Sequence, residues 1–136
     1  LIVPIGTPIS CVLEQAKAEK PEKVLMGGPM MGIAIYDTSL PILKQNNAIL
    51  AFTGKQAKSK PVTNCIRCGR CMRACPMGLT PSLVDFAVKN PKIEELNALN
   101  VMYCMECGSC AFVCPSGRPL TAVMRLAKNE VRKAGK

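Results

Sequence analysis

The chain has 136 residues and a formal net charge of +9, from 18 lysines and arginines against 9 acidic residues. This length holds one ordinary domain or two small ones. There is no histidine, which excludes histidine-based acid–base catalysis and histidine-containing catalytic triads. The charge suggests nucleic acid, but with three phenylalanines, two tyrosines and no tryptophan the chain lacks platforms for base stacking, so we expect no nucleic-acid partner.

Residues 1–53 predict a small α+β module. Thr7 and Pro8 are typical of a helix start, and apolar residues repeat at helical spacing until Lys20 and Pro21. A lone Cys11 in this helix predicts a small buried side chain. Three short apolar segments predict strands, at residues 23–26, 31–35 and 48–52.

The phrase Gly27-Gly-Pro-Met-Met-Gly32 follows the first of these strands, where a nucleotide-binding loop would lie. It fails the G-x-G-x-x-G pattern, because it contains a proline and no helical pattern follows it. A tight turn is the better interpretation. No other motif indicates flavin or nicotinamide binding, and the residues supply no catalytic site.

Residues 54–61 are polar and basic and predict a linker, and residues 62–136 predict an α-helical domain. Thr80 and Pro81 are typical of a helix start, and Asn90 with Pro91 of its end. A second short helix is predicted at 93–99, and a third between Pro119 and Gly135. No segment approaches the run of about 18 apolar residues that a membrane-spanning helix needs.

Two copies of one cysteine run dominate this second domain. They are Cys65-x-x-Cys68-x-x-Cys71-x-x-x-Cys75-Pro76 and Cys104-x-x-Cys107-x-x-Cys110-x-x-x-Cys114-Pro115. Bacterial-type ferredoxins hold 4Fe-4S clusters with this run, and in two-cluster ferredoxins the fourth cysteine ligates the other cluster. We therefore expect Cys65, Cys68, Cys71 and Cys114 to hold cluster one, and Cys104, Cys107, Cys110 and Cys75 to hold cluster two.

Zinc and disulfides are the other uses of paired cysteines. A zinc site leaves the third cysteine of each run and the proline after the fourth unexplained. A disulfide framework suits secreted chains, but no signal-peptide pattern is present and nine cysteines leave one over. The spacing therefore favours iron and sulfide, and oxygen-sensitive clusters predict a reducing compartment, the cytoplasm or the cytoplasmic side of a membrane.

The two runs form an internal repeat with an offset of 39 residues (104 − 65). The repeat also matches Gly69 with Gly108 and Gly78 with Gly117, where glycine permits a positive φ. The chemistry differs, because the first loop carries Arg67, Arg70 and Arg73 and the second carries Glu106 and then Ala111-Phe-Val113. Since cations stabilise a reduced cluster and anions oppose its reduction, we predict the higher reduction potential for cluster one.

Several phrases together resemble the C subunit of Rnf-type ion-translocating electron transport complexes, the RnfC or RsxC family. They are Val3-Pro-Ile-Gly-Thr-Pro8, Lys23-Val-Leu-Met-Gly-Gly-Pro-Met-Met-Gly32, Cys65-Ile-Arg-Cys-Gly69, Tyr103-Cys-Met-Glu-Cys-Gly108, Val113-Cys-Pro115 and Arg118-Pro-Leu120. The resemblance implies a soluble-ligand-binding β-grasp module at 1–53 and a helical ferredoxin domain at 62–136. It implies that FMN and NADH bind to a preceding part of the full subunit.

The resemblance also implies a function. We expect an electron-relay part of a membrane-associated complex that couples electron flow between ferredoxin and NAD to ion transport. Its expected partners are the other subunits and ferredoxin-type redox proteins, and its expected location is peripheral, on the cytoplasmic side of the bacterial inner membrane. The cluster domain of a related cobalamin reductase and a zinc-binding non-redox scaffold are the alternatives.

Overall fold

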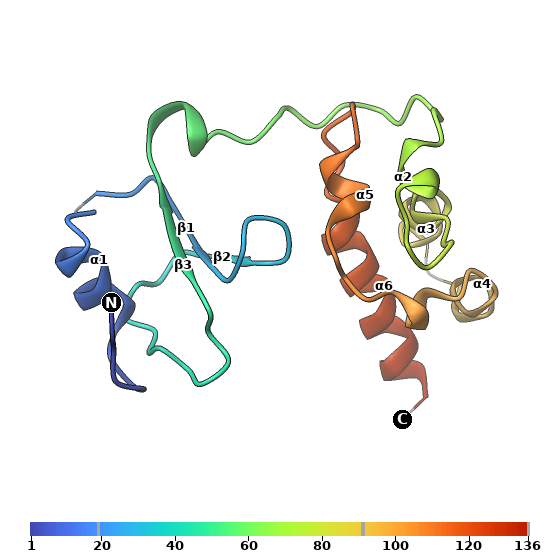
Figure 1. Cartoon of the computed structure of the whole chain (residues 1–136). Coiled ribbons are helices and arrows are strands. Elements are labelled where there is room, and N and C mark those ends of the chain that lie inside the picture. Colours follow the sequence, from blue (N-terminus) through green and yellow to red (C-terminus); the bar gives the residue numbers. More distant parts are fainter. Residues whose placement is uncertain (19, 91, 136) are drawn as a thin grey trace. The chain divides into compact units, whose positions relative to one another are not determined.

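The structure is a computed structural model that describes residues 1–18, 20–90 and 92–135, and it contains two compact units (Figure 1). Unit 1 spans Leu1–Ser59 and unit 2 spans Lys60–Lys136. Unit 1 is a small sheet with one α-helix and unit 2 is helical, so the chain has the predicted α+β fold class. None of the described helices is long and apolar enough to cross a membrane.

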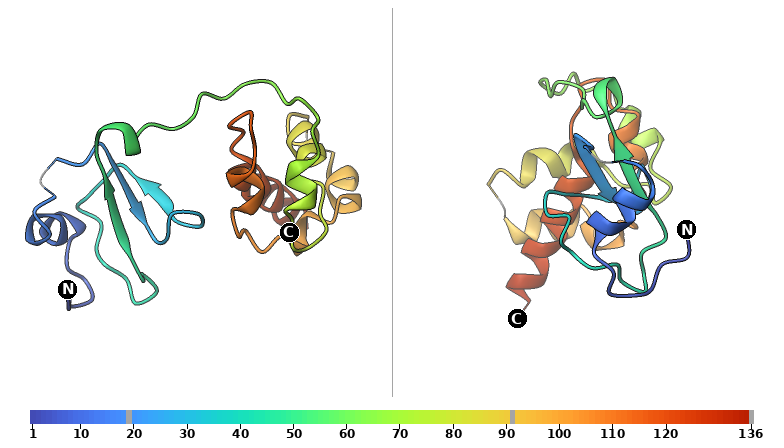
Figure 2. Two further views of the ribbon diagram at one scale, coloured as in Figure 1. Left: turned by 45° about the horizontal axis from the view of Figure 1, so that its top comes forward. Right: turned by 90° about the vertical axis from the view of Figure 1, so that its left-hand side faces the viewer.

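Unit 1 is built on a three-stranded antiparallel sheet with the order β2-β1-β3 (Figures 1 and 2). In the central strand, Leu25 lies opposite Ala34 and Leu50. The core of the unit is formed by Ile9 and Leu13 of the helix with Val24 of the central strand. The elements are α1 (Ile9–Gln15), β1 (Lys23–Met26), β2 (Ile33–Ile35), β3 (Ile49–Phe52) and the 3-10 helix η1 (Gly54–Gln56).

Some predictions for unit 1 need correction. Cys11 is exposed, not buried, because α1 turns Ile9 and Leu13 inward and a residue two positions after Ile9 lies on the opposite side of a helix. The second strand begins at Ile33, not at 31, because the turn extends to Gly32, whose N–H donates to the Gly28 carbonyl at 2.7 Å. The segment 54–61, for which a linker is predicted, begins with the short helix η1.

Unit 2 packs its short helices against one long C-terminal helix (Figures 1 and 2). The elements are α2 (Arg70–Arg73), α3 (Pro81–Ala87), α4 (Ile93–Ala98), the 3-10 helix η2 (Val101–Tyr103), α5 (Ser109–Phe112) and α6 (Leu120–Ala134). Val84, Leu96, Val101 and Met124 are almost fully buried and form the centre of its core. The three predicted helices are present, and the predicted stop at Asn90–Pro91 includes Pro91, which lies outside the described residues.

The internal repeat extends to the backbone of unit 2. Helices α2 and α5 occupy equivalent positions, and α3 and α6 begin at equivalent residues, Pro81 and Leu120. The matched glycines all have positive φ, as predicted: 71° and 84° for Gly69 and Gly108, and 64° and 60° for Gly78 and Gly117. Unit 2 is therefore a structural duplication in which α6 continues beyond the length of α3.

Candidate metal centres

Unit 2 contains two cavities, and each is lined by cysteines of both runs. Cavity I is lined by Cys65, Cys68, Cys71 and Cys114 and encloses about 360 Å³, part of it open to solvent. Cavity II is lined by Cys75, Cys104, Cys107 and Cys110 and encloses about 350 Å³, again partly open. The structure thus brings together the two crossed sets of four cysteines that the spacing predicted.

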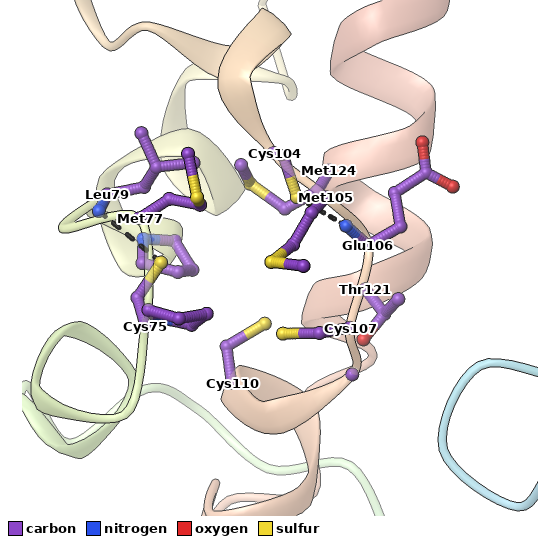
Figure 3. Close-up of a pocket in the computed structure, with 13 residues that line it drawn as sticks. Cys75, Met77, Leu79, Cys104, Met105, Glu106, Cys107, Cys110, Thr121 and Met124 are labelled. Carbon is purple, nitrogen blue, oxygen red and sulfur yellow. Dashed lines mark hydrogen bonds between the residues drawn. The ribbon is translucent and has the colours of Figure 1, made fainter.

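In cavity II the cysteines converge from different elements (Figure 3). Cys75 comes from the segment after α2, and it faces Cys107 and Cys110 across the cavity. The Leu79 N–H donates to Cys75 Sγ and the Glu106 N–H donates to Cys104 Sγ, each at 3.4 Å. Backbone donors aimed at sulfur stabilise its negative charge, which is the environment that a thiolate ligand requires.

The left-handed residues explain how each loop turns its cysteines inward. Arg67 and Glu106 occupy equivalent positions between the first two cysteines and have φ of 55° and 58°. The glycine after the second cysteine, Gly69 or Gly108, then begins a four-residue helix that carries the third cysteine. That third cysteine is buried in both runs. The repeated positive φ values therefore wrap each loop around its cavity.

Three thiols of cavity II, those of Cys104, Cys107 and Cys110, have shifted pKa values. Burial raises the pKa of the Cys104 and Cys110 thiols above the ordinary value, whereas a hydrogen bond with the Ser109 side chain lowers the pKa of Cys107. A metal that binds here has to displace the protons of the Cys104 and Cys110 thiols, whose pKa is raised. Loading of cavity II should therefore be favoured by higher pH.

A group of charges anchors the second loop to α6. Lys128, whose side chain is 10% exposed, donates to the Cys104 carbonyl at 3.0 Å and to Glu106 Oε1 at 2.7 Å. Arg125 Nε donates to Glu106 Oε2 at 2.9 Å. These hydrogen bonds, led by that from Lys128, hold the pKa of Glu106 below its ordinary value. Two cations therefore offset the carboxylate that the sequence placed at cluster two.

A different ion pair stands beside cavity I. Arg118 lines this cavity and donates two hydrogen bonds to Asp85 Oδ2, one of them from Nε at 2.9 Å. The Asp85 side chain is only 5% exposed. The Asp85 carboxylate, with smaller contributions from Cys65 and Cys114, raises the pKa of Arg118. The guanidinium therefore adds a fixed positive charge at the cavity wall.

Four thiols that converge on each cavity supply the ligand set of a four-iron cluster. Within residues 1–18, 20–90 and 92–135, no group of three or more cysteine, aspartate or glutamate side chains is arranged to hold a single metal ion. The donor set is all sulfur, and cysteine thiolates are the usual ligands of 4Fe-4S clusters. Cys11, the ninth cysteine, belongs to unit 1 and lines neither cavity.

Comparison with known proteins agrees with this chemistry. Residues 64–118 match the family model of the 4Fe-4S dicluster domain. The chain is 41% identical over 133 residues to the C subunit of the ion-translocating oxidoreductase complex of Rhodobacter capsulatus, covering 96% of this chain and 26% of that protein. It is a homologue of such C subunits. The dicluster match supports the iron–sulfur prediction over the zinc alternative.

Two further relatives are also C subunits. The chain is 41% identical over 130 residues to that of the Na(+)-translocating ferredoxin:NAD(+) oxidoreductase complex of Acetobacterium woodii, covering 93% of the chain and 29% of that protein. It is 45% identical over 131 residues to that of the ion-translocating oxidoreductase complex of Pseudomonas aeruginosa, covering 94% of the chain and 17% of that protein. The chain therefore spans less than a third of the length of these relatives.

Sequence reasoning missed the residues that support the cavities. Asp85 and Lys128 each lie on a buried helix face, Asp85 beside Val84 and Lys128 beside Ala127. A charge in the apolar stripe of a predicted helix signals a buried partner. That signal was present for both residues, although it does not reveal that the partners are Arg118 and Glu106.

Proposed function

We propose that this chain is the electron-relay part of a membrane-associated, ion-translocating ferredoxin:NAD oxidoreductase complex. The proposal rests chiefly on the crossed arrangement of the two cavities, since each combines three cysteines of one run with the fourth of the other. Homology to C subunits of ion-translocating complexes supports it.

We assign the ligands by cavity. Cys65, Cys68, Cys71 and Cys114 hold cluster one, and Cys75, Cys104, Cys107 and Cys110 hold cluster two. When bound, a 4Fe-4S cluster accepts and releases single electrons without breaking a bond in a substrate. The chain's own residues position the sulfurs, fix the two loops through the Arg118–Asp85 and Lys128–Glu106 pairs, and exclude water with apolar side chains such as Leu79 and Leu120.

The rest of the proposal concerns the whole subunit. Residues 1–53 form a β-grasp-like module, residues 54–61 a basic linker and residues 62–136 the cluster domain. FMN and NADH bind to the part of the subunit that precedes this chain. The assembled subunit lies peripherally on the cytoplasmic side of the bacterial inner membrane, with the other subunits and ferredoxin-type proteins as its partners.

Electron paramagnetic resonance tests the proposal. The protein is purified without oxygen and reduced with dithionite, and the spins are counted per chain. We expect nearly two spins, broadened by magnetic coupling between neighbouring clusters. Protein that contains zinc, no iron and no signal would contradict the relay function. Co-purification with a membrane complex tests the cellular assignment separately.

A further inference from the structure

The surface around cavity I is strongly cationic, and this feature is specific to one half of the duplication. Arg67, Arg70 and Arg73 are all exposed. The repeat places Glu106, Ser109 and Phe112 at the equivalent positions of the second half. The duplicated backbone therefore does not require cations here.

These cations have no acidic partner in the described part of the chain. None of the three arginines takes part in an ion pair there, and the guanidinium of Arg67 lies 6.0 Å from the centre of the Phe86 ring. Residues 38–84 contain no aspartate or glutamate at all. Asp85, the next acid along the chain, is already paired with Arg118. The positive charge is thus available to an external partner.

Further cations extend the same surface. The Nζ of Lys89 lies 5.7 Å from the centre of the same Phe86 ring that Arg67 contacts. Lys60 packs against Gly117, just beyond Pro115 and Ser116, which line cavity I. The Thr63 N–H donates to the Ser116 carbonyl at 2.9 Å and fixes this segment. Exposed cations outside the first loop therefore belong to segments that contact the loop or the wall of cavity I.

The same surface exposes one of the candidate cluster ligands. Cys68 is exposed, whereas its equivalent Cys107 is half-buried and hydrogen-bonded to Ser109 at 3.4 Å. Ile66, also at the edge of cavity I, is 67% exposed and supplies an apolar contact beside the arginines. Electron transfer slows steeply with distance, so a redox partner gains most by approaching through this exposed ligand.

We propose that the cationic face around Cys68, formed by Arg67, Arg70 and Arg73, is the docking site of an acidic one-electron carrier protein. The inference rests on the proposed function, and it makes cavity I the point where electrons enter or leave the domain. In the exchange the reduced carrier loses one electron and the site gains it, with no proton or bond transferred. Complementary charge steers such encounters and raises association rates by about 10- to 1,000-fold at low salt.

The test compares two triple variants that lose the same charge. The first is Arg67→Gln with Arg70→Gln and Arg73→Gln. The matched control removes three exposed cations elsewhere in unit 2: Lys92→Gln, Arg132→Gln and Lys133→Gln. The probe is a reduced, strongly acidic ferredoxin, mixed with the cluster-loaded 136-residue chain in a stopped-flow instrument over a range of salt concentrations.

We expect the arginine variant to exchange electrons at least tenfold more slowly at low salt and to approach the unmodified chain at high salt. The control variant should stay within about twofold. Reduction by photoreduced deazaflavin, a small donor that needs no docking face, should stay within about twofold in both variants. This second donor shows that the clusters of the variant are still reducible, and recovery of the rate at high salt separates docking from a changed driving force, which salt does not restore.

Three results would overturn the docking site. The arginine variant could react as fast as the unmodified chain, or the control could slow equally. Alternatively, the arginine variant could lose binding to phosphatidylglycerol vesicles at an unchanged ferredoxin rate, which would make the face a membrane-binding surface. The spin count of the unmodified chain is measured first, because absence of reducible clusters would contradict the proposed function itself.

Discussion

The two halves of unit 2 share a backbone but differ in the side chains that support each cavity. Beside cavity I, Arg118 pairs with the buried Asp85. The repeat maps this pair onto Leu79 and Met124, which are both buried and both line cavity II. One half thus uses an ion pair where the other uses an apolar contact. Cysteines and positive-φ residues fix the loop, and the contacts behind the loop are free to differ.

The charged contacts of the loops differ in the same way. Arg67 of the first loop lies over Phe86 of α3, and the equivalent residues of the second half, Glu106 and Arg125, form a salt bridge. Lys89 is exposed in the first half, whereas its equivalent Lys128 is buried and bound to Glu106. Each equivalent pair of residues therefore supplies a matched control for the other.

The largest effect is expected from the Asp85–Arg118 pair. Arg118→Leu leaves a buried carboxylate without its partner and should lower the free energy of unfolding by about 3–5 kcal/mol. Asp85→Met combined with Arg118→Leu copies the contact of the other half and should recover to within about 1 kcal/mol of the unmodified chain. Anaerobic urea unfolding measures both. A double variant as unstable as the single one would show that the halves are not interchangeable.

The next largest difference is expected between the stability losses caused by alanine at the equivalent positions Gly78 and Gly117. Gly117→Ala forces alanine into a φ of 60° and puts its Cβ 2.7 Å from the Pro61 carbonyl oxygen. Gly78→Ala meets a φ of 64° but no atom within 4 Å. We expect losses of about 2–4 kcal/mol and about 1–2 kcal/mol respectively, measured by the same unfolding assay. Equal losses would indicate that the segment at Pro61 does not pack on Gly117 in solution.

Substitution of the equivalent residues Lys89 and Lys128 should also destabilise the protein to different extents. Lys128→Met removes two hydrogen bonds from a buried ammonium and should destabilise the protein by about 1.5–3 kcal/mol. Lys89→Met, at an exposed position, should cost less than about 0.5 kcal/mol. Lys128→Met should also lower the midpoint potential of the cavity II cluster in a redox titration. A stability loss with both potentials unchanged would confine Lys128 to a structural role.

The smallest effects concern the reduction potentials. Arg67→Gln should lower the potential of cluster one and Glu106→Gln should raise that of cluster two, each by about 20–60 mV, as screened single charges would. Potentiometric titration followed by electron paramagnetic resonance reads both. If both variants leave both midpoint potentials unmoved, the predicted asymmetry between the clusters is wrong.

The ion pairs of Glu106 with Lys128 and Arg125 should make the stability of the second loop depend on pH. Since Lys128 and Arg125 lower the pKa of Glu106, its carboxylate stabilises the fold at any pH above the ordinary glutamate value. This contribution is lost as the pH falls through the lowered pKa. Acid should therefore weaken the attachment of the second loop to α6, and Glu106→Gln should remove that part of the pH dependence.

Sequence reasoning predicted the features that depend on local order. Cysteine spacing predicted which four cysteines line each cavity, and the offset of the repeat predicted the positive φ of Gly69, Gly78, Gly108 and Gly117. Proline and apolar periodicity predicted the helices that begin at Pro81 and after Pro119. These features are encoded within a few residues, so a single sequence reveals them.

The missed features depend on contacts between distant residues. Cys11 had an apolar sequence context, but the packing of Ile9 and Leu13 against the sheet decided which face of α1 is buried. Glu106 was interpreted as a negative charge beside cluster two, whereas Lys128, 22 positions along the chain, neutralises it. Periodicity identifies a face of a helix but not the element that covers it.

The iron content of two double variants tests the crossed ligand sets most directly. Cys75→Ala with Cys107→Ala removes two ligands of one proposed cluster, so about four iron atoms per chain should remain. Cys75→Ala with Cys68→Ala removes one ligand from each proposed cluster, so both clusters should be lost or depleted of iron. If the first pair loses both clusters and the second retains one intact, each run holds its own cluster and the crossed assignment is wrong.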